Sequence, residues 1–366
     1  MEKNTEVEEI KKVAKKPLKK KKNKGIYSGA TLLDIVLGGG YPPGFINIIG
    51  DSSSGKSFLA GEFLGGAFNS LGGELEWFYD DVEGGFKFDT EKLYGIDILG
   101  KGFLKQEKSS RTLEDFEANV YEIIQKKDPK KPFIYVLDSF DALTSDEELA
   151  FKEKKRKSRK PKADADGNVK EKKEAGSYNL AKQKGAHALF RTMITEIEKN
   201  NICVIIVSQV KENIGSMFGA KYIRTGGKSL DFYPNVVFWL AEVEKYKRQD
   251  RAVGICCKVR ASKSRSATPF RECFLDLFFD LGIDNVGSNI KYLYDLKTAL
   301  GKDAAAMKKD LIWDDVPYSY DALIDHIEEG DLEEELISRT QKKWYDIDKA
   351  ISNDHRKHKY KKKEEK

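Results

Sequence analysis

The residues best suited to chemistry form one glycine-bounded loop between an apolar run at 45–50 and a helical pattern at 57–71. The loop consists of Gly50, Asp51, Ser52, Ser53, Ser54, Gly55, Lys56 and Ser57. Glycines at this spacing let successive backbone N–H groups curve around phosphate oxygens. The Lys56 ammonium can reach the β- and γ-phosphates, and the Ser57 hydroxyl can bind Mg²⁺. The loop therefore predicts a site for a nucleoside triphosphate and Mg²⁺.

Asp138 closes the apolar run FIYVL, which places its carboxylate at the carboxyl edge of the expected sheet, near the loop. An acid at that edge is a typical Mg²⁺ or water partner. We therefore expect Ser57 and Asp138 to hold the metal.

Hydrolysis also needs a group that orients or activates water. Glu83, just after a strand pattern at 74–81, is the candidate, and Asp80 and Asp81 compete for the role. Gln209 ends the apolar run at 203–209, so its amide should lie at the same edge and can sense the γ-phosphate.

The order of apolar runs predicts the fold. Buried strands expected at 45–50, 74–81, 133–140 and 203–209 alternate with helices at 57–71, 112–128 and 179–198. Three further strands are expected at 236–246, 252–262 and 270–280. This alternation is typical of a doubly wound, mostly parallel α/β sheet. Beyond about residue 295, Ile324, Ile327, Leu332 and Leu336 predict one apolar helical face in a small helical region.

Composition narrows the class of protein. Hydrophobic residues make up 40% of the 366 residues, enough for a sizeable core. No apolar stretch approaches the roughly 20 residues that a bilayer requires, which argues against a membrane protein and favours the cytoplasm. The four cysteines and four histidines form no cluster, so no structural zinc site is expected.

Positive charge is concentrated in three segments, although the net charge of the chain is only +5. Residues 1–25 and 150–178 each carry a net charge of +6, and the tail 351–366 carries +4. Basic segments of this kind suit contact with a polyanion such as nucleic acid.

A long glycine-interrupted stretch, 210–232, follows Gln209 and is also rich in cations. Its cations and its apolar pair suit binding and stacking on single-stranded nucleic acid. The residues concerned are Lys211, Met217, Phe218, Lys221, Arg224 and Lys228.

The chain resembles the RecA-family recombinases over roughly 26–282. The similar stretches are YSGATLLDIVLGGGYPPG, GDSSSGKS, YVLDSFDALT, SQVKENIGSMFG, TGGKSLDFY and KSRSATPF. KVRASKSRSATPF and FLDLFFDLGID are also similar to phage UvsX-type recombinases, which implies a phage-encoded member acting in the cytoplasm of a bacterial host.

This resemblance implies a role for each matching residue. Glu83 matches the water-activating glutamate, and Gln209 matches the glutamine that couples the γ-phosphate to the second DNA loop. Lys263 and Arg265 match two cations that reach the ATP of a neighbouring subunit. Gly226 and Gly227 would close the DNA loop that holds Met217 and Phe218.

The resemblance also implies an activity and partners. The expected protein is an ATP- and Mg²⁺-dependent recombinase that forms filaments of its own copies on single-stranded DNA and pairs it with double-stranded DNA. A single-stranded-DNA-binding protein and a loader are further implied partners.

The expected organisation is a basic arm (1–25), a core (26–295), an acidic helical region (296–350) and a basic tail (351–366). Within the core, 150–178 expands the first DNA loop and 210–228 is the second. A ring-forming helicase of the DnaB type, or a DNA-annealing module regulated by its nucleotide, remains an alternative.

Overall fold

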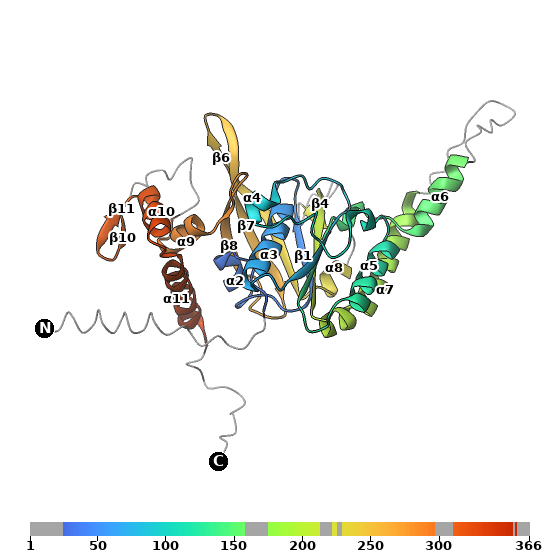
Figure 1. Ribbon diagram of the computed structural model, residues 1–366, viewed down its shortest axis with the longest axis horizontal. Coiled ribbons are helices and arrows are strands. Elements are labelled where there is room, and N and C mark those ends of the chain that lie inside the picture. Colours follow the sequence, from blue (N-terminus) through green and yellow to red (C-terminus); the bar gives the residue numbers. More distant parts are fainter. Residues whose placement is uncertain are drawn as a thin grey trace, which may run out of the picture. The chain divides into compact units, whose positions relative to one another are not determined.

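The computed structural model describes residues 25–157, 175–212, 222–224, 229–296, 310–353 and 356. The chain forms two compact units, one from Lys24 to Ile283 and one that contains the described residues from Asp284 onward. The first unit is an α/β core (Figure 1). Its helices are α2 (Thr31–Val36), α3 (Lys56–Ser70), α4 (Thr90–Tyr94), α5 (Leu113–Lys126), α6 (Asp146–Lys157), α7 (Ala175–Lys199) and α8 (Ser229–Phe232). Its strands are β1 (Gly44–Gly50), β2 (Glu76–Asp81), β3 (Phe133–Asp138), β4 (Ile202–Glu212), β5 (Tyr222–Arg224), β6 (Val236–Arg248), β7 (Arg251–Ser264), β8 (Glu272–Phe278) and β9 (Gly282–Asp284).

One sheet organises this core, in the strand order β2-β3-β4-β1-β6-β7-β8-β9, with β5 paired to β4. In this sheet order, the neighbouring strands β2, β3, β4, β1 and β6 are parallel, whereas β6, β7 and β8 pair antiparallel. The predicted doubly wound, mainly parallel sheet is confirmed. The antiparallel extension arises because β6 and β7 form a hairpin closed by Gln249 and Asp250, both at positive φ.

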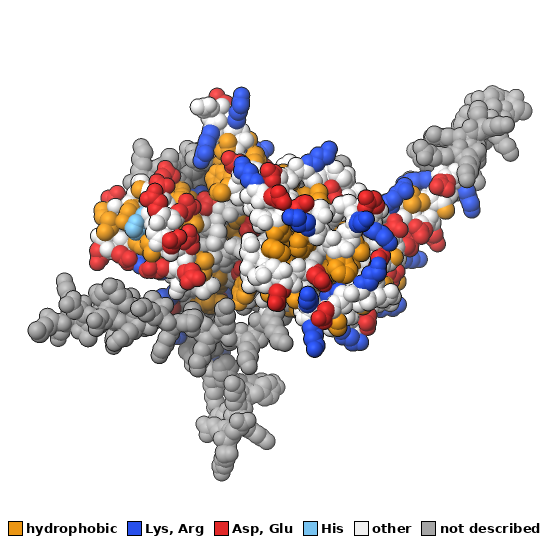
Figure 2. Space-filling model, in the orientation of Figure 1, with side chains coloured by type: hydrophobic (Ala, Val, Ile, Leu, Met, Phe, Trp, Pro, Cys, Tyr) orange, Lys and Arg blue, Asp and Glu red, His pale blue; other side chains and the backbone are white. Residues whose placement is uncertain are grey.

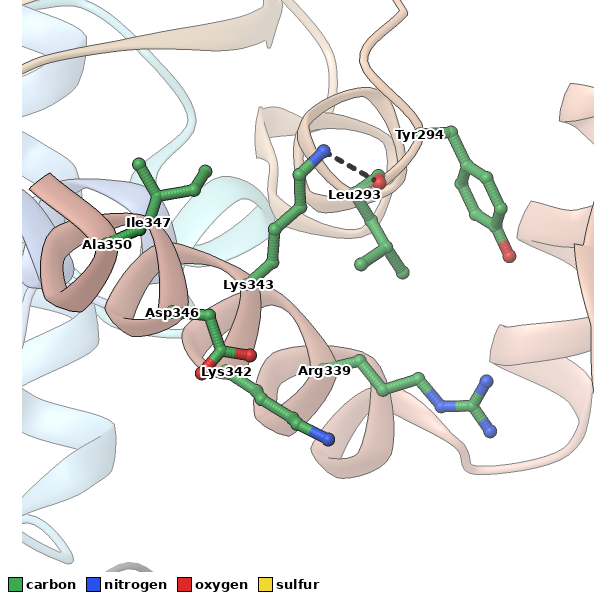
Figure 3. Close-up of a pocket in the computed structure, with 8 residues that line it drawn as sticks. All are labelled: Leu293, Tyr294, Arg339, Lys342, Lys343, Asp346, Ile347 and Ala350. Atoms are coloured by element: carbon green, nitrogen blue, oxygen red, sulfur yellow. Dashed lines mark hydrogen bonds between the residues drawn. The ribbon is translucent and has the colours of Figure 1, made fainter.

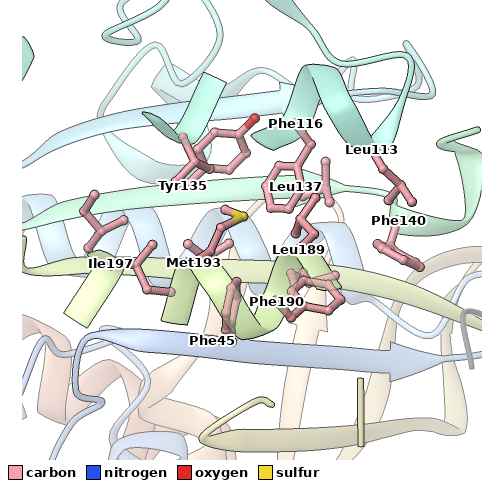
Figure 4. Packing of buried hydrophobic residues seen from close by; sticks show 14 of the residues in the cluster. Phe45, Leu113, Phe116, Tyr135, Leu137, Phe140, Leu189, Phe190, Met193 and Ile197 are labelled. Carbon is pink, nitrogen blue, oxygen red and sulfur yellow. The ribbon is translucent and has the colours of Figure 1, made fainter. Parts of the chain in front are cut away.

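Helices cover both faces of the sheet. On one face, α5 and α7 bury a cluster that includes Phe45, Phe116 and Phe190 (Figure 4). On the other, α3 brings the ring of Phe63 to 6.2 Å from that of Phe238. A capping box between Thr112 and Asp115 starts α5, close to the predicted position.

The basic insert 150–178 is helical at both ends, which corrects its prediction as a loop. Helix α6 runs through Lys157 and α7 begins at Ala175. Figure 1 shows α6 leading away from the sheet. Residues 158–174 lie outside the described part of the chain.

The second unit contains α9 (Asn285–Leu293), a hairpin of β10 (Leu311–Trp313) and β11 (Val316–Tyr318), α10 (Tyr320–Glu329) and α11 (Glu333–Ile351). The prediction of one apolar helical face is wrong, because Ile327 belongs to α10 and Leu336 to α11. Both side chains pack with Trp313 in one small core. Figure 2 shows acidic side chains gathered on this unit, in agreement with the eleven acids of residues 310–335.

None of the helices in the described ranges has the length and apolar character needed to span a bilayer.

Candidate nucleotide site

The phosphate-binding loop joins the end of β1 to the start of α3. Gly55 adopts φ 88°, a left-handed conformation that favours glycine. A Cβ on Gly50 would overlap the Ser54 hydroxyl and lie 2.9 Å from the Leu240 carbonyl oxygen. Both glycines are therefore required by the local backbone. The loop leaves the amino end of α3, with its unpaired N–H groups, next to the space enclosed by the loop, and this end attracts anions.

Lys56 is held over its own loop, where its ammonium donates to the Asp51 carbonyl at 2.6 Å. Burial lowers the pKa of Lys56, while four surrounding carboxylates, led by Asp138, act in the opposite direction. The Lys56 ammonium is therefore surrounded by carboxylates.

Sheet register brings the predicted residues to one edge. Gly50 pairs with Gln209 on β4, and Asp81 pairs with Asp138 on β3. Glu83 follows β2 by two residues. The end of β1, which carries the phosphate loop, therefore lies directly beside the end of the strand that leads into the second loop.

Glu83 and Gln209 are in direct contact, since the Gln209 amide donates to the Glu83 carboxylate at 3.3 Å. The Ser139 hydroxyl donates to the same Glu83 oxygen. The backbone N–H of Gln209 donates to Asp141 at 2.6 Å. This arrangement couples the end of β4 to the carboxylate expected to position water.

The two competing carboxylates are engaged differently. Asp80 is fully buried and accepts hydrogen bonds from Ser110 and from the Tyr135 hydroxyl, the latter at 2.5 Å. Asp81 accepts the backbone N–H groups of Gly85 and Phe86 and so closes the turn after β2. Among these three acids, Glu83 is the one hydrogen-bonded to Gln209.

Asp138 and Ser57 form the donor set for a cation. Asp138 accepts hydrogen bonds from the Ser57 hydroxyl and, at 2.8 Å, from the Tyr79 hydroxyl. Burial raises the pKa of Asp138, and these hydrogen bonds oppose that shift. A hydroxyl and a carboxylate beside a phosphate loop suit Mg²⁺, which prefers oxygen ligands.

An aromatic wall completes the site and was missed by the sequence analysis. The loop opens into a hollow of about 500 Å³ that is also lined by Phe58, Phe86, Phe88 and Phe279. The Phe58 and Phe88 rings lie 4.2 Å apart. Aromatic faces beside a phosphate loop can stack on a nucleobase. The pair in GGFKF, just after Glu83, was the available signal.

Comparison with known proteins agrees with this geometry. A family model described as the RecA N-terminal domain matches residues 156–284. Protein RecA of Malacoplasma penetrans is 29% identical over 268 residues, which cover 72% of this chain and 71% of that protein. Protein RecA of Bacteroides thetaiotaomicron is 29% identical over 297 residues, covering 81% and 77%.

The chain is similar to these RecA proteins over most of its length. Its core has the RecA-like α/β fold, with helices in the C-terminal unit. Among solved structures, the RadB recombinase aligns with a TM-score of 0.44 and 17% identity, over 70% of this chain and 98% of that one.

Lys263 and Arg265 lie toward the amino edge of the sheet, away from the carboxyl edge that carries their own phosphate loop. Lys263 pairs with Val237 at the start of β6, whereas Gly50 pairs with Leu240 further along the same strand. Both cations bind backbone carbonyls at the end of α8, with Lys263 donating to the Asp231 and Phe232 oxygens at 2.8 and 2.6 Å. Arg265 donates to the Phe232 oxygen at 2.8 Å.

The second loop is described only at its ends. Lys211 lies on β4, and Arg224 ends the short strand β5, which pairs with β4. Arg224 is directed into the protein and not toward solvent. The other predicted loop residues fall outside the described part of the chain: Met217, Phe218, Lys221, Gly226, Gly227 and Lys228.

A second hollow, of about 580 Å³, lies within the C-terminal unit beside α11 (Figure 3). Arg339 and Lys343 line it, but Arg339 is paired with Asp314 and Glu335, and Lys343 with Asp295. These carboxylates neutralise the two cations, so the hollow is a poor site for a phosphate.

Proposed function

We propose that the protein is an ATP-dependent DNA recombinase that assembles on single-stranded DNA and promotes homologous pairing and strand exchange. The observation that carries this proposal is the direct hydrogen bond between Glu83 and Gln209. It joins the carboxylate that would align water to the strand that enters the second loop. Nucleotide state and loop position would therefore be coupled through one contact.

ATP would lie with its phosphates in the loop from Gly50 to Ser57 and its base against Phe86 and Phe88. Mg²⁺ would be held by Ser57 and Asp138, and it would neutralise charge on the phosphate oxygens. Lys56 would exchange its hydrogen bond to Asp51 for one to the γ-phosphate. Glu83 would hold water in line for attack, and Gln209 would respond to the γ-phosphate.

Lys263 and Arg265 would complete the site of a neighbouring copy. Their place at the amino edge of the sheet supports this role, since the phosphate loop of their own chain lies at the carboxyl edge. Triphosphate shared between two copies would favour assembly, and hydrolysis would weaken it.

The second loop would bind DNA through Lys211, Lys221 and Lys228, with Met217 and Phe218 against the bases and Gly226 and Gly227 closing the loop. The basic insert 150–178 would add phosphate contacts, which are sensitive to salt. The resemblance to phage recombinases suggests a viral source and remains a prediction from sequence.

The test is an ATPase assay with and without single-stranded DNA, run beside a strand-exchange assay. Wild-type protein should show DNA-stimulated hydrolysis and strand exchange. Lys56→Ala should abolish both, and Glu83→Gln should reduce hydrolysis by about 10²-fold or more.

Other outcomes would favour the alternatives. Unwinding of a forked duplex without strand exchange would identify a helicase. Two results together would identify an annealing module: Glu83→Gln would keep full pairing activity, and DNA would barely stimulate hydrolysis by the wild-type protein.

A further inference from the structure

We propose that Arg224 is a positioning residue that clamps the returning end of the second loop to the central sheet, and that it does not itself contact DNA. This role deepens the proposed function and rests on it for its effect on DNA. It also revises the assignment of Arg224 to the DNA-binding cations.

The contacts of Arg224 point inward. Its side chain is only 6% exposed, and its guanidinium donates to the Asp231 carboxylate at 2.5 Å. A second arm of the guanidinium donates to the Asn47 side-chain oxygen. A cation poised for a phosphate backbone would instead remain in solvent, as long basic side chains usually do.

Asn47 connects the clamp to the strands of the nucleotide site. It lies on β1, three residues before Gly50, and is fully buried. Its amide nitrogen donates at 2.8 Å both to the Ile206 carbonyl and to the Ser208 hydroxyl on β4. Arg224 thus joins β5, at the returning end of the loop, and α8, which follows the loop, to the β1–β4 pair that carries Gly50 and Gln209.

The buried charge of Arg224 is balanced by carboxylates of the protein, of which Asp231 is itself largely exposed. Burial lowers the pKa of Arg224, and the Asp231 and Asp141 carboxylates oppose that shift. Its Nε has no hydrogen-bond partner among the described residues. A buried guanidinium stays charged and depends on its carboxylate partners, so losing one of them leaves an uncompensated charge.

Asp141 brings the clamp to the catalytic edge. The same carboxylate accepts the backbone N–H of Gln209 at 2.6 Å. Because the stem of the loop is already fixed by Arg224, DNA binding would not have to order it. Loss of the clamp should therefore weaken DNA binding without removing a phosphate contact.

The clamp can be tested without DNA by hydrogen exchange on the full chain. Arg224→Lys keeps the charge but not the two-armed contact, and Asp231→Asn removes the carboxylate. Both should speed exchange in residues 222–232 by about tenfold or more, with the rest of the core unchanged. Arg191→Lys, at an exposed position on α7, is the matched control. Wild-type protection in both variants would overturn the clamp.

DNA binding in ATP separates the clamp from a phosphate contact. The clamp predicts that Arg224→Lys and Asp231→Asn each weaken affinity about fivefold or more, non-additively, because they break one interaction. The slope of log affinity against log salt should stay at its wild-type value. A phosphate contact predicts near-normal Arg224→Lys, tighter binding by Asp231→Asn, and a slope smaller by about one in Arg224→Gln.

The two proposals can fail separately. If the wild-type protein binds no single-stranded DNA, the proposed function is wrong, while hydrogen exchange still decides whether the clamp exists. If the wild type binds DNA and both variants bind equally well, the clamp is wrong and the function stands.

Discussion

Replacing Glu62 with glutamine should change the pH dependence of stability. Glu62 lies on α3, the helix that follows the phosphate loop, and its carboxylate accepts the backbone N–H of Ile283. Burial, followed by the nearby Asp34 carboxylate, raises the pKa of Glu62 from 4.5 to about 8. Burial also raises the pKa of Asp34 to about 7, against the opposing hydrogen bonds from Ser28.

The sign follows from proton linkage. The folded protein holds the Glu62 proton more tightly than the unfolded chain does, so its stability falls as pH rises from about 4.5 toward 8. Each pKa unit corresponds to about 1.4 kcal/mol. The Glu62 side chain keeps some access to solvent, which reduces the free-energy cost below the value that the full pKa shift would give. We expect this group to remove roughly 2–4 kcal/mol from the free energy of unfolding between about pH 5 and 8.

Urea unfolding at a series of pH values between about 5 and 8 measures this effect. Glu62→Gln should lose less stability across the range than the wild type, since one of the two neighbouring buried carboxylates no longer titrates. Glu107→Gln, at an exposed position, is the control and should follow the wild type. If the Glu62→Gln and wild-type curves are parallel, the buried-carboxylate explanation is refuted.

Three further outcomes follow from the site. Tyr79→Phe removes a 2.8 Å hydrogen bond to Asp138, which should raise the Mg²⁺ concentration for half-maximal ATPase severalfold; an unchanged Mg²⁺ titration would contradict the assigned donor set. Gly66→Ala would place a Cβ on the backbone of the segment before α2, and thermal unfolding should show a loss of about 2 kcal/mol or more, whereas a neutral result would contradict the close approach. Mixing Lys56→Ala with Lys263→Ala protein should restore part of the ATPase that each lacks alone, because some shared sites become complete; no recovery would argue that Lys263 does not serve a neighbouring copy.

The residues at the carboxyl edge were predictable because strand ends are local features. Gly50, Asp138 and Gln209 each end an apolar run, and parallel strands place such ends at one edge. The Glu83–Gln209 contact joins residues 126 positions apart and needed the strand order as well. The resemblance to RecA proteins supplied that information, while spacing alone left Asp80 and Asp81 as competitors.

The burial of Arg224 could not be predicted from the local sequence. Its partner Asn47 is 177 residues away, so nothing near Arg224 distinguishes a buried guanidinium from one that faces solvent. The prediction of one helical face in the C-terminal unit was wrong for a related reason. Apolar residues at helical spacing continue across the turn at Gly330 and Asp331, so two short helices were interpreted as one face.

The carbonyl oxygens at the end of α8 have a consequence for association between copies. In the isolated chain these oxygens already accept hydrogen bonds from Lys263 and Arg265, so the phosphates of a neighbouring copy would have to displace them, if the proposed shared site forms. A singly charged anion offers little advantage in such an exchange, whereas a group with several charges offers much more. Burial lowers the pKa of Lys263 to about 8, so solution above that pH weakens the attraction and leaves Arg265 as the remaining cation. In the isolated chain, Lys263 and Arg265 are therefore less available to small anions.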